Sequence, residues 1–422
     1  MKVVRGYKTE LDLNNEQRTA CLKHAGAARF AYNWGLSRSQ EIYRARGKRP
    51  SAVDLHKQLN ALKPTEFPWA YEVSKCAMQE ALRDLDNAFK HFFRRLALKK
   101  QGKLKGKVGY PKLKKKSKAI GSFRLTGAIH VFENAVQLPR LGRLRLHEHG
   151  YIPTDAKVLS ATVSEQAGRW FVSVQVEREQ EKPVPVTTTS IGVDLGIKVL
   201  ATCSDGMTFE NPRALKHAQK KLKRLERAKS RRKKGSQNRL KARKAIAKLH
   251  ARIANIRKDA SHKLTSYLSK NHALVAIEDL HVAGMLKNHK LAQAVSDSNL
   301  GEIRRQLEYK AAWHGTHVVT IDRFYPSSKT CSGCDYIKPE LSLRERTFVC
   351  EQCGMVLDRD LNAAKNIVAE ALRSTASSGG TYACGVDSSG LRNGASETVY
   401  VEAGTQGDVW ALSQMSMFER TG

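Results

Sequence analysis

Two pairs of cysteines in the last third of the chain constrain the fold more than any other sequence feature. Cys331 and Cys334 form one Cys-x2-Cys pair, Cys350 and Cys353 form a second, and 15 residues separate the pairs. Four thiolates at this spacing fit two knuckles that hold one tetrahedral Zn²⁺ ion. Because protein ligands fill all four positions, the predicted zinc is structural rather than catalytic. Another metal or a redox role is the alternative.

The remaining cysteines argue against a disulfide framework, which is typical of small secreted domains. The chain has 422 residues, enough for two to four domains, and its other cysteines are scattered. We expect these thiols to be reduced and inert: Cys21, Cys76, Cys203 and Cys384. The sequence has neither an apolar run of about 18 residues for a membrane span nor an apolar leader after Met1. It therefore predicts a soluble, intracellular protein.

The charge balance predicts a polyanionic partner. The chain has 74 Lys and Arg against 40 Asp and Glu, a formal net charge of +34. Such a charge repels itself in a compact protein unless a nucleic acid or another polyanion binds. A protein that is merely soluble and basic is the alternative. Locally, we expect Lys329 and Arg346 to help keep the four zinc-binding thiolates ionised.

Two segments concentrate this charge. Residues 90–118 contain 13 Lys and Arg and no acid, and glycines and a proline favour a loop along a nucleic-acid backbone over a solvated helix. Residues 213–258 contain 20 Lys and Arg, and apolar stripes on both sides of Gly235 predict a helical hairpin. A hairpin whose charged faces contact only solvent is the alternative, but like charges at this density destabilise helices. The expected backbone contacts are Lys112, Lys114, Lys115, Lys116, Arg231, Arg232, Lys233 and Lys234.

Local patterning divides the rest of the chain into helical and β regions. The patterning predicts a short strand at residues 3–8 and a helical region at residues 15–98. Its apolar stripe consists of Met78, Leu82, Leu85, Phe89, Phe92 and Leu96. Residues 120–178 predict strands, including a hairpin that turns at Ala167-Gly168, and residues 179–189 a linker. The Gly- and Ser-rich residues 371–422 predict a disordered tail.

Acids at the ends of two apolar strands and at the start of a helix predict a second metal site. Asp194 ends an apolar strand, Glu278 ends another, and Asp358 and Asp360 begin a helix. Taken singly, each acid is more typical of a turn or a helix cap. Converging carboxylates repel one another unless cations join them, and Mg²⁺ prefers such oxygen ligands. Two such ions can support phosphodiester cleavage, so a polycation with this cluster is interpreted as a nuclease.

Several segments together resemble the transposon-encoded TnpB proteins, the presumed ancestors of type V CRISPR effectors. The match runs in order from residue 1 to about residue 370, and the set of motifs is specific although no single one is. The nuclease-like segments are GVDLGIK, AIEDL, SSKTCSGC, CEQCG and DRDLNAAKNI. The N-terminal segments are EQRTACLKHAGAARFAYNWGL, VSKCAMQEALRDLDNAFKHFF and VQLPRLGRLRL.

The resemblance implies a multidomain α+β protein. A helical recognition lobe is inserted in a small β-barrel (wedge) domain, and an RNase H-like RuvC nuclease domain with an inserted zinc ribbon follows. The expected boundaries are 1–14 for the first barrel strand, 15–118 for the lobe with its basic loop, 119–182 for the barrel, 183–325 and 358–370 for the nuclease, 326–357 for the zinc ribbon and 371–422 for the tail.

The resemblance also implies an RNA-guided DNA endonuclease. Such a protein binds a guide RNA from the transposon end and cuts double-stranded DNA beside a short transposon-adjacent motif. Its catalytic triad falls on Asp194, Glu278 and Asp360, which would bind two Mg²⁺ or Mn²⁺ ions. All three acids are present, so activity is expected, in a monomer located in the cytoplasm of a prokaryote near the nucleoid. A guided repressor without cleavage, an RNA-independent RuvC-like nuclease and a transposition accessory factor are the alternatives.

The resemblance further suggests residues that read the adjacent motif. Lys75 and Gln79 lie four apart on a predicted helix and therefore share a face. Gln can pair bidentately with adenine, and Lys can reach guanine or phosphate. Thr126 and Tyr43 are further candidates, and a merely solvated helix face is the alternative.

Overall fold

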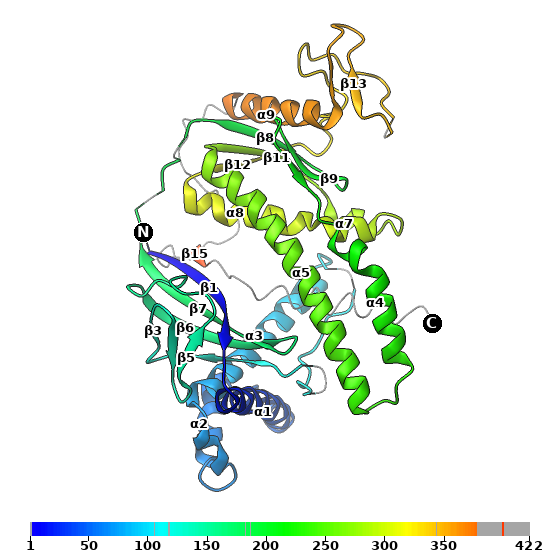
Figure 1. Ribbon diagram of the computed structural model, residues 1–422. Helices are drawn as coiled ribbons and strands as arrows, with labels where there is room; N and C mark the ends of the chain where they lie inside the picture. The colour runs from blue at the N-terminus through cyan, green and yellow to red at the C-terminus, as the bar shows by residue number, and fades with distance from the viewer. Residues whose placement is uncertain are drawn as a thin grey trace. The chain divides into compact units, whose positions relative to one another are not determined.

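The computed structural model describes residues 2–104, 106–116, 119–181, 183–185, 187–342, 344–377 and 399–400 (Figure 1). The chain forms two compact units. The first consists of Met1–Glu179 and Ser396–Gly422, and the second of Gln180–Ala395. Cys384 and most of the predicted tail lie outside the described residues.

The first unit is built on an eight-stranded sheet whose N-terminal strand lies in the middle. Its strands run in the order β2-β6-β7-β1-β5-β4-β3, and β15 (Val399–Tyr400) pairs in parallel with β1. The bounds are β1 Lys2–Asp12, β2 Ser122–Leu125, β3 His130–Val131, β4 Ala135–Leu138, β5 Gly142–Leu146, β6 Lys157–Gln166 and β7 Arg169–Glu179. The predicted hairpin is confirmed as β6–β7, with Val172, Val174 and Val176 buried on one face.

The helices of this unit lie between β1 and β2 in the sequence, as predicted for a lobe inserted into a β domain. They are α1 Asn15–Arg46, α2 Ala52–Leu62, the 3-10 helix η1 Pro68–Glu72 and α3 Lys75–Lys100. Capping boxes begin α1 and α2 at Asn14 and Ser51, and left-handed Gly47 ends α1. The apolar stripe of α3 is confirmed as core from Met78 to Phe89, whereas Phe92 and Leu96 are only half-buried.

The second unit contains a five-stranded sheet in the order β10-β9-β8-β11-β12. Its strands are β8 Ser190–Leu195, β9 Val199–Cys203, β10 Thr208–Glu210, β11 Leu274–Glu278 and β12 His317–Ile321. Strands β8, β11 and β12 are parallel, and β9 is antiparallel to β8. The carboxyl ends of the three parallel strands therefore meet at one edge, which is where Asp194 and Glu278 lie.

Helices cover both faces of this sheet, which explains why β11 is apolar from Leu274 to Ile277. The helices of the second unit are α4 Ala214–Ser230, α5 Gln237–Asn271, α6 Val282–Met285, α7 Ala292–Ser298, α8 Leu300–His314 and α9 Arg359–Ser377. Figure 1 shows α9 on one side of the sheet and α5 with α8 on the other. Val275 and Ile277 pack with α5 and α8, whereas Leu274 and Ala276 pack with α9. No helix in the described ranges is long and apolar enough to cross a membrane.

The predicted basic hairpin is confirmed as α4 and α5, with its tip at residues 231–236. Its base is fixed by Asp297 at the end of α7. The Asp297 carboxylate accepts the backbone N–H groups of Leu215 and Lys216 and pairs with Arg257 of α5 at 2.8 Å. Asp297 thus supplies from another helix the N-terminal cap that α4 lacks, and its charge suits the helix dipole.

The last element corrects one predicted boundary. The four-cysteine segment carries the hairpin of β13 (Thr347–Val349) and β14 (Val356–Asp358), and α9 follows directly. The disordered tail was expected from residue 371, but α9 continues to Ser377 because Ala371 is fully buried against the sheet. Gly and Ser enrichment of the whole tail obscured this last helical turn.

Gly192 of β8 permits the close approach of α9, and this predicts a severe effect of substitution. A Cβ at Gly192 would lie 2.0 Å from the carbonyl oxygen of Ala364 and 2.8 Å from the backbone nitrogen of Val368. Gly192→Ala should therefore lower the free energy of unfolding by about 3 kcal/mol or more, measured by urea denaturation. Gly301→Ala in α8 is the control, because a Cβ there would meet no atom within 4 Å. An equal effect of the two substitutions would contradict the predicted role of Gly192.

Candidate metal centres

The parallel ladder between β8 and β11 brings the first two acids together. Its register pairs Val193 with Ile277, so Asp194 and Glu278 are the next residues on neighbouring strands. Adjacent strands lie about 4.8 Å apart, which puts the two carboxylates within electrostatic range. Both residues are partly buried at the end of the sheet.

Helix α9 brings the third acid to the same place. Asp360 lies in its first turn, one turn before Ala364, whose carbonyl group contacts Gly192 of β8. The pKa of Asp194 reflects the nearness of the other two acids. Burial, and then the charges of Glu278 and Asp360, raise this pKa to about 7. The three acids therefore lie within electrostatic range of one another.

The structure separates the roles of the two acids at the start of α9. The Asp358 carboxylate accepts the backbone N–H groups of Asp360 at 2.9 Å and Leu361 at 3.1 Å, so Asp358 caps the helix. The Asp360 carboxylate instead pairs with the guanidinium groups of Arg359 at 3.1 Å and Arg346 at 3.7 Å. Asp360 is thus the acid that a cation could recruit, and Asp358 is bound to backbone.

Asp279, which follows Glu278 in the sequence, is paired with two guanidinium groups, as Asp360 is. Its carboxylate pairs with Arg304 at 2.7 Å and with Arg323, and the Arg304 hydrogen bond in particular lowers its pKa. Glu278, by contrast, receives a hydrogen bond from the neutral hydroxyl of Ser327 at 2.5 Å. Glu278 is therefore contacted by an uncharged donor, in contrast to the guanidinium groups at Asp279. The carboxylate oxygens of Asp194, Glu278 and Asp360 are a donor set suited to divalent cations such as Mg²⁺.

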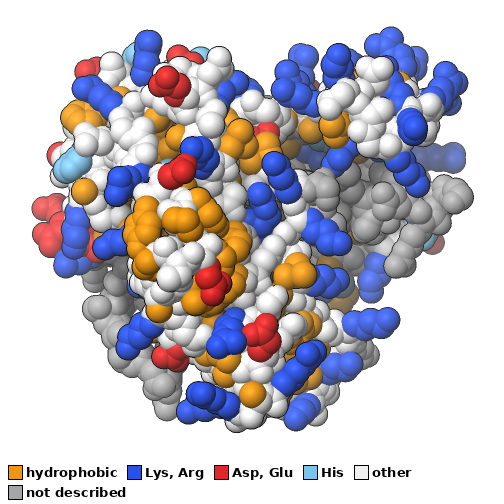
Figure 2. Space-filling model, turned by 90° about the horizontal axis from the view of Figure 1, so that it is seen from below, with side chains coloured by type: hydrophobic (Ala, Val, Ile, Leu, Met, Phe, Trp, Pro, Cys, Tyr) orange, Lys and Arg blue, Asp and Glu red, His pale blue; other side chains and the backbone are white. Residues whose placement is uncertain are grey.

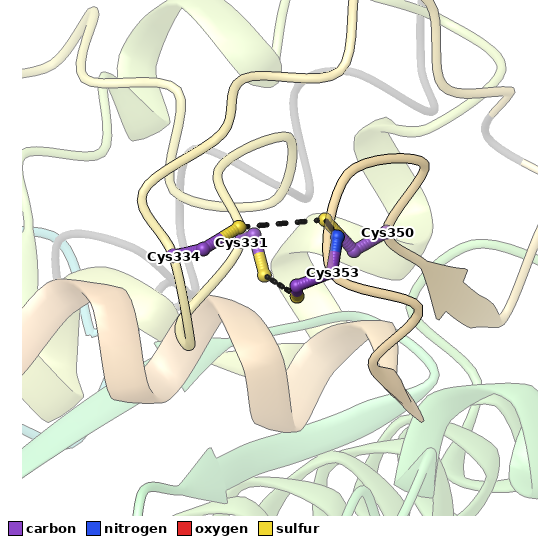
Figure 3. A group of neighbouring side chains, drawn as sticks. All are labelled: Cys331, Cys334, Cys350 and Cys353. Carbon is purple, nitrogen blue, oxygen red and sulfur yellow. Dashed lines mark hydrogen bonds between the residues drawn. The ribbon is translucent and has the colours of Figure 1, made fainter.

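The four cysteines form a second candidate centre (Figure 3). Their sulfur atoms all lie within 4.8 Å of one another, and the Cys331–Cys353 and Cys334–Cys350 pairs are each 3.6 Å apart. Tetrahedral zinc with 2.3 Å bonds separates its sulfur ligands by about 3.8 Å, so the cluster fits such an ion. The backbone N–H of Cys353 lowers the pKa of Cys350 to about 6, which favours the thiolate.

The two basic residues expected to assist these thiolates bind other partners. The Lys329 ammonium donates to the carbonyl oxygen of Pro339, and Arg346 pairs with Asp360. Backbone N–H groups approach the sulfur atoms instead, from Gly333 to Cys331 at 3.4 Å and from Cys353 to Cys350 at 3.5 Å. Closeness in sequence misled the prediction, because the β13–β14 hairpin carries Arg346 to the start of α9.

The other thiols behave as predicted where they are described. Burial raises the pKa of Cys21 and of Cys203 to about 12, so both remain protonated at neutral pH. Cys76 of α3 is half-buried, and its sulfur donates to the carbonyl oxygen of Thr126.

The candidate motif readers fall into two places. Lys75 and Gln79 lie in the first turns of α3. The hydrogen bond from the Cys76 thiol to the carbonyl oxygen of Thr126 brings Thr126 beside them. Burial and the charges of Lys63, Arg83 and Lys75 lower the pKa of His56, so positive charge gathers near this helix start.

Tyr43 does not join this group. The backbone N–H of Ser74 donates to His24 of α1, and a Cβ on Gly35 of α1 would meet Leu82 and Leu85 of α3, so the two helices run in the same direction. Tyr43 follows His24 by 19 residues, roughly 28 Å along α1, and is therefore far from Lys75. It is exposed, at 59%.

The predicted backbone-contacting residues are mostly open to solvent. Lys112, Lys115, Lys116 and the hairpin-tip residues Arg231, Arg232, Lys233 and Lys234 are exposed. Asn33 exchanges two hydrogen bonds with the backbone of Lys114, whose ammonium lies 4.1 Å from the centre of the Tyr32 ring. Figure 2 shows many Lys and Arg side chains in the view, with fewer Asp and Glu side chains between them. This surface suits a polyanion.

Family models match three parts of the chain. One described as "Probable transposase" matches residues 161–289, one described as "Cas12f1-like, TNB domain" matches residues 301–367, and one described as "Helix-turn-helix domain" matches residues 1–48. The last range contains β1 and the single helix α1, and thus no helix-turn-helix within the residues that the structure describes.

Curated relatives cover nearly the whole chain. A Streptomyces pristinaespiralis protein named "Putative RNA-guided DNA endonuclease" is 37% identical over 89% of this chain and 91% of its own length. InsQ of Escherichia coli, with the same description, is 33% identical over 87% and 92%. The solved Cas12f1–sgRNA–target DNA complex aligns with a TM-score of 0.49 at 15% identity, over 83% of this chain and 82% of that one. By its match to the curated relatives, the chain belongs to the TnpB family of transposon-associated proteins.

The raised pKa of Asp194 predicts that divalent cations bind in competition with a proton. At pH 6 Asp194 is mostly protonated and at pH 8 mostly ionised, because its pKa is about 7. Mg²⁺ or Mn²⁺ should therefore bind about tenfold more tightly at pH 8 than at pH 6, with proton release below pH 7. Isothermal titration calorimetry in buffers of different ionisation enthalpy measures both quantities. Asp194→Asn should abolish this binding, and pH-independent binding by the wild type would contradict the cluster.

Proposed function

We propose that the protein is an RNA-guided, Mg²⁺-dependent DNA endonuclease of a transposable element. The observation that carries the proposal is the convergence of Asp194, Glu278 and Asp360 at one edge of the five-stranded sheet. The related proteins named as RNA-guided DNA endonucleases support it, since they align over most of this chain. The substrate would be double-stranded DNA beside a short transposon-adjacent motif.

The domain assignment belongs to the same proposal. The order β10-β9-β8-β11-β12, with only β9 reversed, supports an RNase H-like RuvC domain interrupted by the four-cysteine element. The eight-stranded sheet around β1 supports a wedge domain with the helical recognition lobe inserted after its first strand. Its closure into a barrel remains a prediction, because no ladder within the described residues joins β2 to β3.

The roles of the residues follow from their contacts. Two Mg²⁺ or Mn²⁺ ions, when bound, would activate a water molecule and stabilise the leaving oxygen of the phosphodiester. Asp194 would hold the ions with Glu278 and Asp360. Arg359 and Arg346 pair with Asp360, and guanidinium groups are well suited to binding phosphate. The four cysteines would hold one structural Zn²⁺.

The partners would be a guide RNA from the transposon end and its DNA target. The exposed Lys and Arg of residues 112–116 and 231–234 suit backbone contacts to an RNA–DNA hybrid. Lys75, Gln79 and Thr126 are the proposed readers of the adjacent motif, and Tyr43 would act away from them. We propose a monomer that works in the prokaryotic cytoplasm near the nucleoid.

The competing functions make different predictions about the acids and the RNA. A guided repressor would not need three converging carboxylates, because binding alone uses none of them. An RNA-independent nuclease or accessory factor would cut branched or free DNA without a guide. Cleavage of a plasmid in Mg²⁺, with and without the copurified RNA, separates these possibilities.

The two acids at the start of α9 supply a matched pair of variants. Asp358→Asn should retain cleavage within about threefold, because asparagine also caps helices. Asp360→Asn should lower cleavage by about 10³-fold or more, as expected for loss of a metal-binding carboxylate. The rate of cleavage of a guide-matched plasmid in Mg²⁺ measures both, and guide RNA binding should be unchanged.

Loss of cleavage in Asp358→Asn, with full activity of Asp360→Asn, would reverse the assignment. Full activity of both variants would remove the acid cluster from the reaction altogether. In that case the nuclease proposal would fail, even if the guide RNA still bound.

A further inference from the structure

Ser327 lies where the four-cysteine element meets the acid cluster. It follows β12 by six residues, precedes Cys331 by four, and is 5% exposed. Its hydroxyl donates to Glu278 Oε1 at 2.5 Å. We propose, on the basis of the proposed function, that Ser327 is a positioning residue that orients the Glu278 carboxylate for divalent cations. Asn362 and Asn366 of α9 hold Ser327 in place.

The first part of the argument concerns what a neutral donor does to Glu278. A hydroxyl that occupies one carboxylate oxygen fixes the rotation of the side chain and leaves the other oxygen available. Asp279, the next residue, shows the contrast, because two guanidinium groups bind and neutralise it. Ser327 therefore orients Glu278 without cancelling the charge that attracts a cation. Outer hydrogen-bond partners orient metal ligands in this way in many proteins.

The second part concerns how Ser327 is held. Asn366 donates from Nδ2 to the carbonyl oxygen of Ser327 at 2.7 Å and to that of Thr330 at 2.6 Å. Asn362, one turn earlier on α9, donates to Thr330 at 2.7 Å and accepts the backbone N–H of Ser332 at 3.0 Å. Both asparagines are almost completely buried, so these bonds cannot be replaced by solvent without a penalty.

The third part links the two metal centres through this segment. Residues 327–332 run from the Glu278 contact to the first cysteine, and both asparagines that hold them lie on the helix that carries Asp360. The cysteine-containing segment thus touches two acids, through Ser327 at Glu278 and through Arg346 at Asp360. A shift of this segment would move the Ser327 hydroxyl away from Glu278.

The test measures cation binding directly, apart from cleavage. Full-length protein carrying Ser327→Ala, Ser327→Thr or Ser328→Ala is titrated with Mn²⁺ by calorimetry and by electron paramagnetic resonance. Ser328 is the matched control, because it is adjacent and its hydroxyl makes no hydrogen bond within the part of the chain that the structure describes. Ser327→Ala should weaken Mn²⁺ binding about 10- to 100-fold, Ser327→Thr should stay within about threefold of wild type, and Ser328→Ala should not differ.

Zinc content and guide RNA binding separate positioning from folding. Both should be unchanged in Ser327→Ala, while the Mg²⁺ concentration that gives half-maximal cleavage rises. Wild-type Mn²⁺ affinity in Ser327→Ala, equal weakening in Ser327→Thr and Ser327→Ala, or loss of zinc together with Mn²⁺ binding would each overturn the proposal.

Failure of the proposed function has a different signature. If wild-type protein binds Mn²⁺ in a manner lost in Asp194→Asn but never cleaves guided DNA, the endonuclease proposal fails. The positioning role of Ser327 is then still decided by the Mn²⁺ titrations. Absence of such binding in wild-type protein would overturn both.

Discussion

The burial of the Asp194 carboxylate beside those of Glu278 and Asp360 is the constraint on which the rest of the second unit depends. Burial and the neighbouring charges raise the pKa of Asp194 to about 7, against an ordinary value of 3.8. At about 1.4 kcal/mol per pKa unit, ionising Asp194 in the cation-free protein costs roughly 4 kcal/mol more than in water. The fold tolerates this because β8 and β11 fix two of the acids on adjacent strands. Helix α9, pressed against Gly192, fixes the third.

The cysteine element takes part in this arrangement. It supplies a hydroxyl to Glu278 and a guanidinium group to Asp360, and two buried asparagines join it to α9. The two candidate metal centres are therefore parts of one hydrogen-bonded structure within the second unit. The basic hairpin is fixed to the same unit through Asp297, which caps α4 and pairs with Arg257 of α5. The second unit therefore carries both the basic hairpin, which suits nucleic acid, and the carboxylates, which suit cations.

Local patterns in the sequence were enough to predict the strands that carry Asp194 and Glu278, the cysteine cluster, the basic hairpin and the inserted helices. The choice of Asp360 over Asp358 came from family resemblance, and the structure adds the physical reason, since Asp358 caps α9. The contacts of three residues could not be predicted, because their partners are distant in the sequence and leave no periodic pattern. These residues are Ser327, Asn362 and Arg346. The buried asparagines four residues apart, in a helix that is otherwise apolar on that face, were the one available signal.

Crystallography with Mn²⁺ tests the central claim most directly. Anomalous difference density collected near the manganese edge should show two peaks bounded by the carboxylates of Asp194, Glu278 and Asp360. One of them should contact the Glu278 oxygen that Ser327 leaves available. A peak absent from this cluster, or bound instead by Asp358 or Asp279, would contradict the account of the site.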